Sequence, residues 1–295
     1  FDNKIFDDWN WDVGFGIIST DRQDFASNKN GVSLISTQFN GTKSLEVDFK
    51  RFSFSETKHL NRYIDYAYFF ETKKRIQKLF IESNNPLQLL KNHARQGRVF
   101  IKEDTNSIYK ISISDFKGNQ SNLTIPIIGL KKDLPQLKSP PFNLRQITAN
   151  EETLLEKDRV SVQIYKDSFY EDIAISFEVT NDTLKLHKPI IPLKKSMNIS
   201  FDISQYEESD KDKLYIGSVS RYGNILYYTP TNKRGNILTA RTKYLGNYTL
   251  GIDDEKPKIK AINFKDDSWI SNYRYLKVKI SDEISAIIKK QNKSQ

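Results

Sequence analysis

The side chains that most often bind metals or act as general bases are sparse in this chain. Its 295 residues include three histidines, His59, His93 and His187, and no cysteine. Zinc enzymes commonly hold two ligands close together in sequence, as HxH on a strand or HExxH on a helix. No two of these histidines lie within thirty residues of each other. The sequence therefore predicts no catalytic residue, no cofactor-binding residue and no metal ligand.

Other catalytic motifs are also missing from the sequence. It has no GxSxG nucleophile motif, no GxxxxGK[ST] phosphate loop and no GxGxxG after a strand. Asp21, Asp24, Asn28 and Asn30 group oxygen-bearing side chains in one stretch, so calcium is an alternative there. Their spacing is not that of an EF-hand, and Asp and Asn are ordinary turn formers, so we favour a turn.

Positive charge is concentrated in one segment. The chain carries a net charge of +9, but residues 1–49 carry −4 and residues 50–102 carry +8. Within the second segment four cations occupy six positions, at Lys73, Lys74, Arg75 and Lys78. These four predict a patch for an anionic polymer. The alternatives are an ordinary solvated surface, or a patch neutralised by the acidic residues before it.

The same segment interleaves its cations with aromatic residues, a combination that can hold single-stranded nucleic acid. We do not favour nucleic acid as a partner, because no recognised RNA- or DNA-binding motif accompanies these residues. Aromatic residues at such positions more often fill a β core.

Short β-rich runs separated by turn residues dominate the rest of the chain. Asn40-Gly41 is typical of a tight hairpin after the run 32–39, and Lys117-Gly118-Asn119 is typical of another between 108–114 and 123–128. Further strands are expected at 99–102, 160–165, 173–179, 197–203, 246–250 and 275–280. One helix of two or three turns is expected after Ser53, which has capping-box spacing to Glu56. The predicted fold class is therefore all-β, with one short helical excursion.

Proline and charge divide the chain into domains. Residues 131–141 hold three prolines and no strand pattern, which is typical of a linker. We expect a first β-sandwich with a basic helical insertion at 1–130, a second at 142–252 and a partial third β domain at 256–295. No run of about 18 apolar residues occurs, so no transmembrane helix is predicted. Because the sequence begins with Phe1, we expect a mature or excised fragment.

Several segments, in this order, resemble the region that follows the catalytic domain in M23-family peptidoglycan endopeptidases of Bacteroidetes. The segments that carry the resemblance are Gly14-Phe-Gly-Ile-Ile-Ser-Thr-Asp21, Phe49-Lys-Arg-Phe-Ser-Phe-Ser-Glu-Thr57, Asn61-Arg-Tyr-Ile-Asp-Tyr66, Thr242-Lys-Tyr-Leu-Gly-Asn-Tyr-Thr-Leu250 and Ile262-Asn-Phe-Lys-Asp-Asp-Ser-Trp-Ile-Ser-Asn272. The resemblance implies tandem Ig-like β-sandwich domains, exported to the periplasm or cell surface.

The zinc ligands of that family lie upstream of its β domains and have no counterpart in this sequence, so no catalytic residue is carried over. The resemblance implies a non-catalytic accessory region that positions a peptidase on peptidoglycan, with cell-wall glycan or another envelope protein as partner. The alternative is a stand-alone envelope binding module, or a subunit of a cell-surface complex, with no link to hydrolysis.

Overall fold

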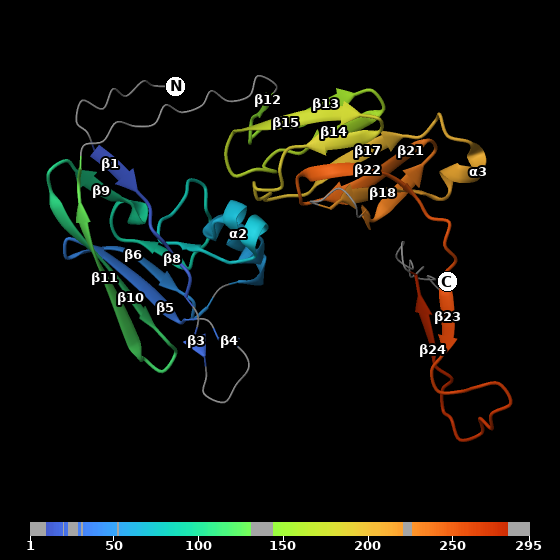
Figure 1. Ribbon diagram of the computed structural model, residues 1–295, viewed down its shortest axis with the longest axis horizontal. Coiled ribbons are helices and arrows are strands. Elements are labelled where there is room, and N and C mark those ends of the chain that lie inside the picture. Colours follow the sequence, from blue (N-terminus) through green and yellow to red (C-terminus); the bar gives the residue numbers. More distant parts are fainter. Residues whose placement is uncertain are drawn as a thin grey trace. The chain divides into compact units, whose positions relative to one another are not determined.

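A computed structural model describes residues 10–19, 21–22, 29–30, 32–51, 53–130, 144–220 and 226–282. The regular structure of the described residues consists mainly of antiparallel sheets with few helices, so the predicted all-β fold class is confirmed (Figure 1). The chain divides into two compact units. The first comprises Phe1–Phe142, Phe169–Asp172 and Pro189–Lys194, and the second comprises Asn143–Ser168, Ile173–Lys188 and Lys195–Gln295.

The first unit is built on a five-stranded antiparallel sheet with the order β11-β10-β5-β6-β8. Three short strand pairs, β1–β9, β2–β7 and β3–β4, accompany it. The strands are β1 (Asn10–Val13), β2 (Gly16–Ile17), β3 (Asp21–Arg22), β4 (Lys29–Asn30), β5 (Leu34–Phe39), β6 (Thr42–Asp48), β7 (Gln77–Lys78), β8 (Leu90–Asn92), β9 (Val99–Lys102), β10 (Asn106–Ser114) and β11 (Gln120–Ile128).

The core of the first unit lies against the sheet. Ile35, Leu45, Val47 and Tyr109 are fully shielded from solvent. The ring of Tyr109 stacks on Phe15 at a centroid distance of 4.1 Å. Side chains from the helices and loops complete this core, among them Tyr63, Ile64, Leu79, Leu87 and Leu89.

Both predicted hairpins of this unit are present. Asn40 and Gly41 have φ values of 46° and 80° between β5 and β6. This left-handed pair is what a two-residue hairpin turn requires, and glycine adopts it without a steric penalty. Gly118, at a φ of 90°, lies in the turn between β10 and β11, where the Asp115 carboxylate accepts hydrogen bonds from the N–H groups of Lys117 and Asn119.

The helical segment begins where the sequence predicts but is longer. The Ser53 hydroxyl caps a 3₁₀ helix, η1 (Phe54–His59), by accepting from the N–H of Ser55. Helix α1 (Leu60–Tyr63) follows directly, and α2 (Tyr66–Thr72) starts after Asp65, whose carboxylate accepts from the N–H of Tyr68. The sequence predicted one helix in this segment, whereas the structure adds α2 because Asp65 supplies a further cap. A short 3₁₀ turn, η2 (Arg95–Gly97), lies farther along.

The second unit contains a six-stranded sheet, β12-β15-β16-β22-β18-β19, and a five-stranded sheet, β13-β14-β17-β21-β20. Strands β14 and β17 alternate between buried and half-buried residues, as expected when one face of a sheet is packed. The strands are β12 (Leu144–Ile147), β13 (Thr153–Lys157), β14 (Val160–Ile164), β15 (Ile173–Thr180), β16 (Thr183–Leu186), β17 (Met197–Asp202), β18 (Leu214–Val219), β19 (Leu226–Tyr228), β20 (Thr231–Arg234), β21 (Ile237–Thr242) and β22 (Gly246–Ile252), with helix α3 (Glu208–Lys211) between β17 and β18.

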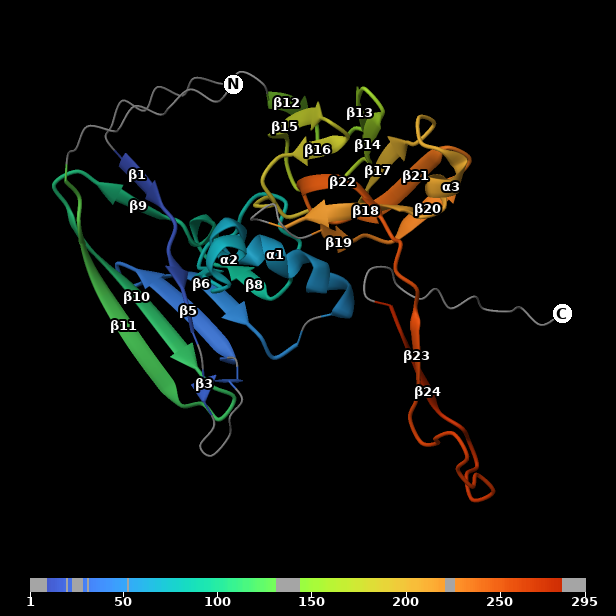
Figure 2. The ribbon, with the colours of Figure 1, turned by 45° about the vertical axis from the view of Figure 1, so that its right-hand side comes forward.

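The core of the second unit is mainly apolar. The largest of its fully buried side chains are Ile147, Ile164, Ile175, Leu184, Leu186, Met197, Ile199 and Phe201. After β22 the chain forms a separate two-stranded ribbon, β23 (Lys258–Ala261) with β24 (Val278–Ser281) (Figure 2). The predicted linker 131–141 lies outside the described residues, and the predicted division at residue 256 stays a prediction. No helix among the described residues is long and apolar enough to cross a membrane.

Candidate functional site

Three of the four predicted patch cations lie together at the end of α2. Lys73 ends the helix in the left-handed conformation, with a φ of 62°, and its N–H donates to the Phe69 carbonyl at 2.8 Å. The N–H of Lys74 then donates to the Thr72 hydroxyl at 3.2 Å. The side chains of Lys73, Lys74 and Arg75 are all exposed, so this tight helix end presents three adjacent positive charges to solvent.

Aromatic rings support two of these cations. The Lys73 Nζ atom lies 5.8 Å from the Phe69 ring centroid and 5.2 Å from that of Phe70. The Arg75 guanidinium lies 4.8 Å from the Phe69 centroid. None of Lys73, Lys74 and Arg75 forms an ion pair within the part of the chain that the structure describes. Ring contacts orient a cation without neutralising it, so this surface, the basic-aromatic cluster, keeps its charge available for an anion.

The fourth predicted cation, Lys78, does not join this cluster. It is half-buried, and its Nζ atom lies 2.8 Å from the carboxylate of Glu82. It also donates to the Arg62 carbonyl at 3.4 Å. The acidic residue four positions later supplies a partner for Lys78, so its charge is compensated and it does not contribute to the predicted patch.

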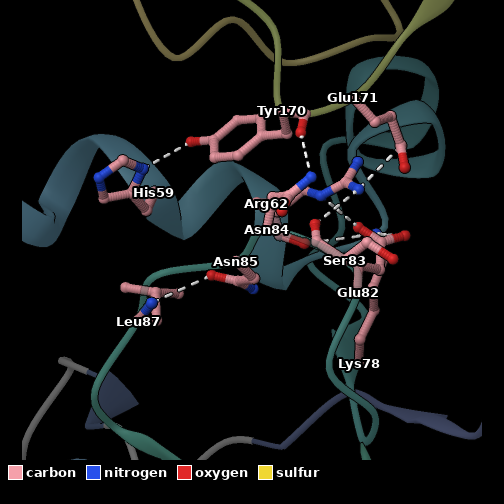
Figure 3. Close-up of polar contacts among 10 residues, drawn as sticks. All are labelled: His59, Arg62, Lys78, Glu82, Ser83, Asn84, Asn85, Leu87, Tyr170 and Glu171. Carbon is pink, nitrogen blue, oxygen red and sulfur yellow. Dashed lines mark hydrogen bonds and ion pairs between the residues drawn. The ribbon is translucent and has the colours of Figure 1, made fainter. Parts of the chain in front are cut away.

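Lys78 belongs instead to a buried polar cluster centred on Arg62 (Figure 3). The Arg62 side chain is 9% exposed, with Nε 2.9 Å from Glu82 and Nη2 2.8 Å from Glu171. Nη2 also donates to the Ser83 carbonyl at 3.3 Å. A buried guanidinium requires such partners because removing a charge from water costs several kcal/mol. A polar hollow of about 150 Å³ adjoins it, lined by Arg62, Ile81, Glu82, Ser83, Gln96, Arg98 and Glu171.

Next to Arg62, Tyr170 is held from three directions. Its hydroxyl lies 2.7 Å from Nδ1 of His59, its carbonyl accepts from the Asn84 amide at 2.8 Å, and the Arg62 guanidinium lies 5.3 Å from its ring centroid. Burial raises the pKa of Tyr170 to about 12. Burial also lowers the pKa of His59, and the nearby Lys58 and Lys194 lower it further, against a smaller opposing effect of Glu56. At neutral pH the phenol and the imidazole are therefore both uncharged, so the contact between the Tyr170 oxygen and Nδ1 of His59 is a neutral, structural hydrogen bond.

A hollow of about 600 Å³ in the first unit lies beside the end of β6 and was not indicated by any sequence motif. Its lining residues are Asp48, Lys50, Arg51, Ser53, Glu56, Gln88, Leu89 and Lys91. Lys91 bridges Glu46 at 2.9 Å and Asp48 at 3.0 Å. Hydrogen bonds from Lys43 and then Lys91 lower the pKa of Glu46. A hydrogen bond from the Lys50 backbone, and then one from Lys91, lower the pKa of Asp48. Both carboxylates stay ionised at neutral pH and are unsuited to act as general acids.

A smaller hollow, about 270 Å³, lies in the second unit between β18, β20 and the end of β22. Tyr215 and Tyr228 form one wall, with ring centroids 5.5 Å apart. Its charged lining residues are already engaged, since Lys233 lies 2.5 Å from Asp212 and Lys213 lies 2.9 Å from Asp254.

No group of three or more His, Asp or Glu side chains that could hold a metal ion occurs among the residues that the structure describes. Of the calcium alternative, Asp24 and Asn28 lie outside the described residues. Asp21 and Asn30 are paired through the backbone of β3 and β4.

The second sandwich coincides with a known domain type. Residues 145–253 match the family model of the Zu5-like domain. The match runs from within β12 to just past β22, so it covers both sheets of the second unit and stops before the β23–β24 ribbon. No curated protein matches the chain, and no solved structure does.

Proposed function

We propose that this chain is a non-catalytic accessory region of an exported cell-wall peptidase system, and that it holds the peptidase on peptidoglycan through the basic-aromatic cluster. In this proposal the chain lies in the periplasm or at the cell surface of a Bacteroidetes-type bacterium. The resemblance of its segments to the region after the M23 catalytic domain supports this assignment.

The observation that carries the proposal is the uncompensated charge of the basic-aromatic cluster. Lys73, Lys74 and Arg75 are exposed, adjacent and without acidic partners among the described residues, and Phe69 fixes two of them in place. Peptidoglycan carries free carboxylates on its stem peptides. An exposed cation cluster gains free energy at such a polyanion by releasing its counterions, and salt weakens that gain.

One experiment tests the two halves of the proposal together. Purified chain is incubated with purified sacculi and added zinc at low and at high salt. Sedimentation then measures binding, and the release of soluble fragments measures hydrolysis. The proposal expects salt-sensitive sedimentation and no release beyond that of a heat-denatured sample. Zinc-dependent release that survives repurification would overturn the non-catalytic half, and absence of sedimentation at low salt would overturn the binding half.

A further inference from the structure

The polar hollow beside Arg62 has fixed charges of both signs in its wall. Seven residues line it, all of them in the first unit, and Ile81 is the one apolar residue among the seven. The wall includes two arginines, Arg62 and Arg98, and two glutamates, Glu82 and Glu171. The space measures about 150 Å³. A water molecule takes about 30 Å³ in the liquid, so the hollow has room for a group of a few heavy atoms.

The charged groups of this wall keep hydrogen-bonding capacity beyond their contacts with each other. Nε of Arg62 contacts Glu82, and Nη2 contacts Glu171 and the Ser83 carbonyl. Nη1, which carries two of the five N–H donors of a guanidinium, has no partner within the part of the chain that the structure describes. Glu171 contacts Arg62 through Oε1 alone, and its side chain is 46% exposed. Figure 3 shows the guanidinium between the two glutamates.

One wall of the hollow is a strained turn that hydrogen bonds hold in place. Arg95, Gln96 and Gly97 have consecutive φ values of 48°, 55° and 79°, and Gln96 lines the hollow. The Gln96 carbonyl accepts from the N–H of Ile81 at 2.8 Å, and its N–H donates to the Asn92 side chain at 2.9 Å. Left-handed backbone is uncommon outside glycine, and such strain is found most often at ligand sites. The turn therefore gives the hollow a preformed wall.

The composition of the wall narrows the class of ligand. Two arginines disfavour a metal cation, and two glutamates disfavour a simple anion, because like charges repel. A sugar ring stacks on an open aromatic face, but arginines cover the rings near this hollow. The Arg98 guanidinium lies 4.6 Å from the Phe80 ring centroid, and that of Arg62 lies 5.3 Å from the Tyr170 centroid. The wall therefore favours a small group that carries both charges.

We infer that this hollow binds the head group of an α-amino acid, in which an ammonium and a carboxylate share one carbon. Nη1 of Arg62 and the Arg98 guanidinium donate to the carboxylate. Glu82 and Glu171 accept from the ammonium. Hydrogen bonds in which both groups are charged are the stronger kind, so this ligand gains at both ends. The same head group occurs in free amino acids and at the unlinked end of the diamino acid in a peptidoglycan stem peptide.

The first test varies the ligand and leaves the chain unchanged. Alanine is titrated into the full chain labelled with nitrogen-15, and the side-chain Nε–H signals of the arginines are followed by NMR. Alanine should give a saturable shift with a Kd on the order of 1 mM. N-acetylalanine lacks the ammonium and alanine amide lacks the carboxylate, so each should bind at least ~10-fold more weakly. Absence of a saturable shift with alanine, or equal binding of either analogue, would overturn the inference.

The second test locates the bound amino acid. Glu171→Gln keeps the shape of the side chain and an oxygen for Arg62 but removes the negative charge, so it should weaken alanine binding at least ~10-fold. The matched control is Glu178→Gln, which changes an exposed glutamate of the second unit and should bind alanine as the wild type does. Circular dichroism checks that both variants fold. Unchanged affinity in Glu171→Gln would place the amino acid elsewhere and contradict the inference.

A third comparison distinguishes the two sources of the head group. The probe is the stem tripeptide alanyl-γ-glutamyl-diaminopimelate, titrated in the same way. Tighter binding of the tripeptide than of alanine assigns the ligand to the cell wall, and equal or weaker binding assigns it to free amino acids. The site does not rest on the proposed function. This titration reports on Glu171, whereas sedimentation with sacculi reports on the basic-aromatic cluster, so either can fail alone.

Discussion

The Tyr170 hydroxyl lies 2.7 Å from Nδ1 of His59, although 111 positions separate the two residues in the sequence. The imidazole is buried, and the two rings meet edge-on at a centroid distance of 5.7 Å. This contact ties the segment Phe169–Asp172 to the end of the 3₁₀ helix η1 inside the first unit.

The burial of His59 predicts a pH dependence of stability. The folded pKa of His59 is lowered, so protonation favours the unfolded chain. The stabilisation is fully present above the unfolded pKa of about 6.5 and is lost as the pH falls below that value toward the folded pKa. Urea midpoints of the wild type should therefore decline between neutral pH and pH ~5. The variant His59→Gln should show a smaller decrease of the urea midpoint over this pH range than the wild type. The pKa of His187 in the second unit is also lowered by burial, so His187→Gln should reduce the remaining part of the decline. Identical pH profiles for wild type and His59→Gln would contradict the assignment.

A second prediction concerns Arg62. Arg62→Met removes the guanidinium but keeps much of its length, leaving Glu82 and Glu171 without their shared partner. Breaking a buried ion pair costs about 3–5 kcal/mol, and we expect the lower end because Lys78 still pairs with Glu82 and Glu171 is 46% exposed. The control, Arg98→Met, removes a half-buried arginine whose partner Asp12 is 54% exposed, and it should cost less than about 1 kcal/mol. Urea unfolding followed by circular dichroism measures both, and equal losses would show that the Arg62 cluster is not a stabilising element.

A third prediction compares two glycines with nearly the same φ angle. Gly97 has a φ of 79° and Gly41 a φ of 80°. In this left-handed region, alanine at either position should lower the free energy of unfolding by about 1–2 kcal/mol. A Cβ at Gly97 would also lie 2.5 Å from the Leu79 carbonyl oxygen, whereas one at Gly41 meets nothing within 4 Å. Gly97→Ala should therefore destabilise the chain by about 1–3 kcal/mol more than Gly41→Ala. Equal free energies of unfolding for the two variants would show that the backbone around Gly97 can shift to accommodate a Cβ without a loss of stability.

Local patterns in the sequence predict the features of this fold that depend on neighbouring residues. Asn40-Gly41 marks its hairpin because the turn needs positive φ at two consecutive positions, and Ser53 marks a helix start because its hydroxyl caps the first turn. Strand 99–102 is found with the predicted bounds. Helix α2 was missed because its aromatic residues are poor indicators of helix, and its start depends on the cap at Asp65.

The Arg62 cluster could not be predicted in the same way. Arg62 and Glu171 are 109 positions apart, and only the fold brings them together. Lys78 also shows that spacing along the sequence does not determine which residues are in contact. Its spacing placed it with Lys73, Lys74 and Arg75, but the chain after α2 turns it toward Glu82. For the basic-aromatic cluster, the sequence indicated the three cations but not the support that Phe69 gives to two of them.

The central claim, that the basic-aromatic cluster holds the chain on an anionic cell-wall polymer, is tested most directly by reversing its charges. The triple variant Lys73→Glu/Lys74→Glu/Arg75→Glu is compared with Lys157→Glu/Lys185→Glu/Lys243→Glu, which reverses three exposed lysines of the second unit and changes the net charge equally. Sedimentation with purified sacculi is measured at low and high salt. We expect the first variant to lose the salt-sensitive binding to sacculi and the second variant to keep most of it. Equal binding by the two variants, or wild-type binding that is insensitive to salt, would contradict it.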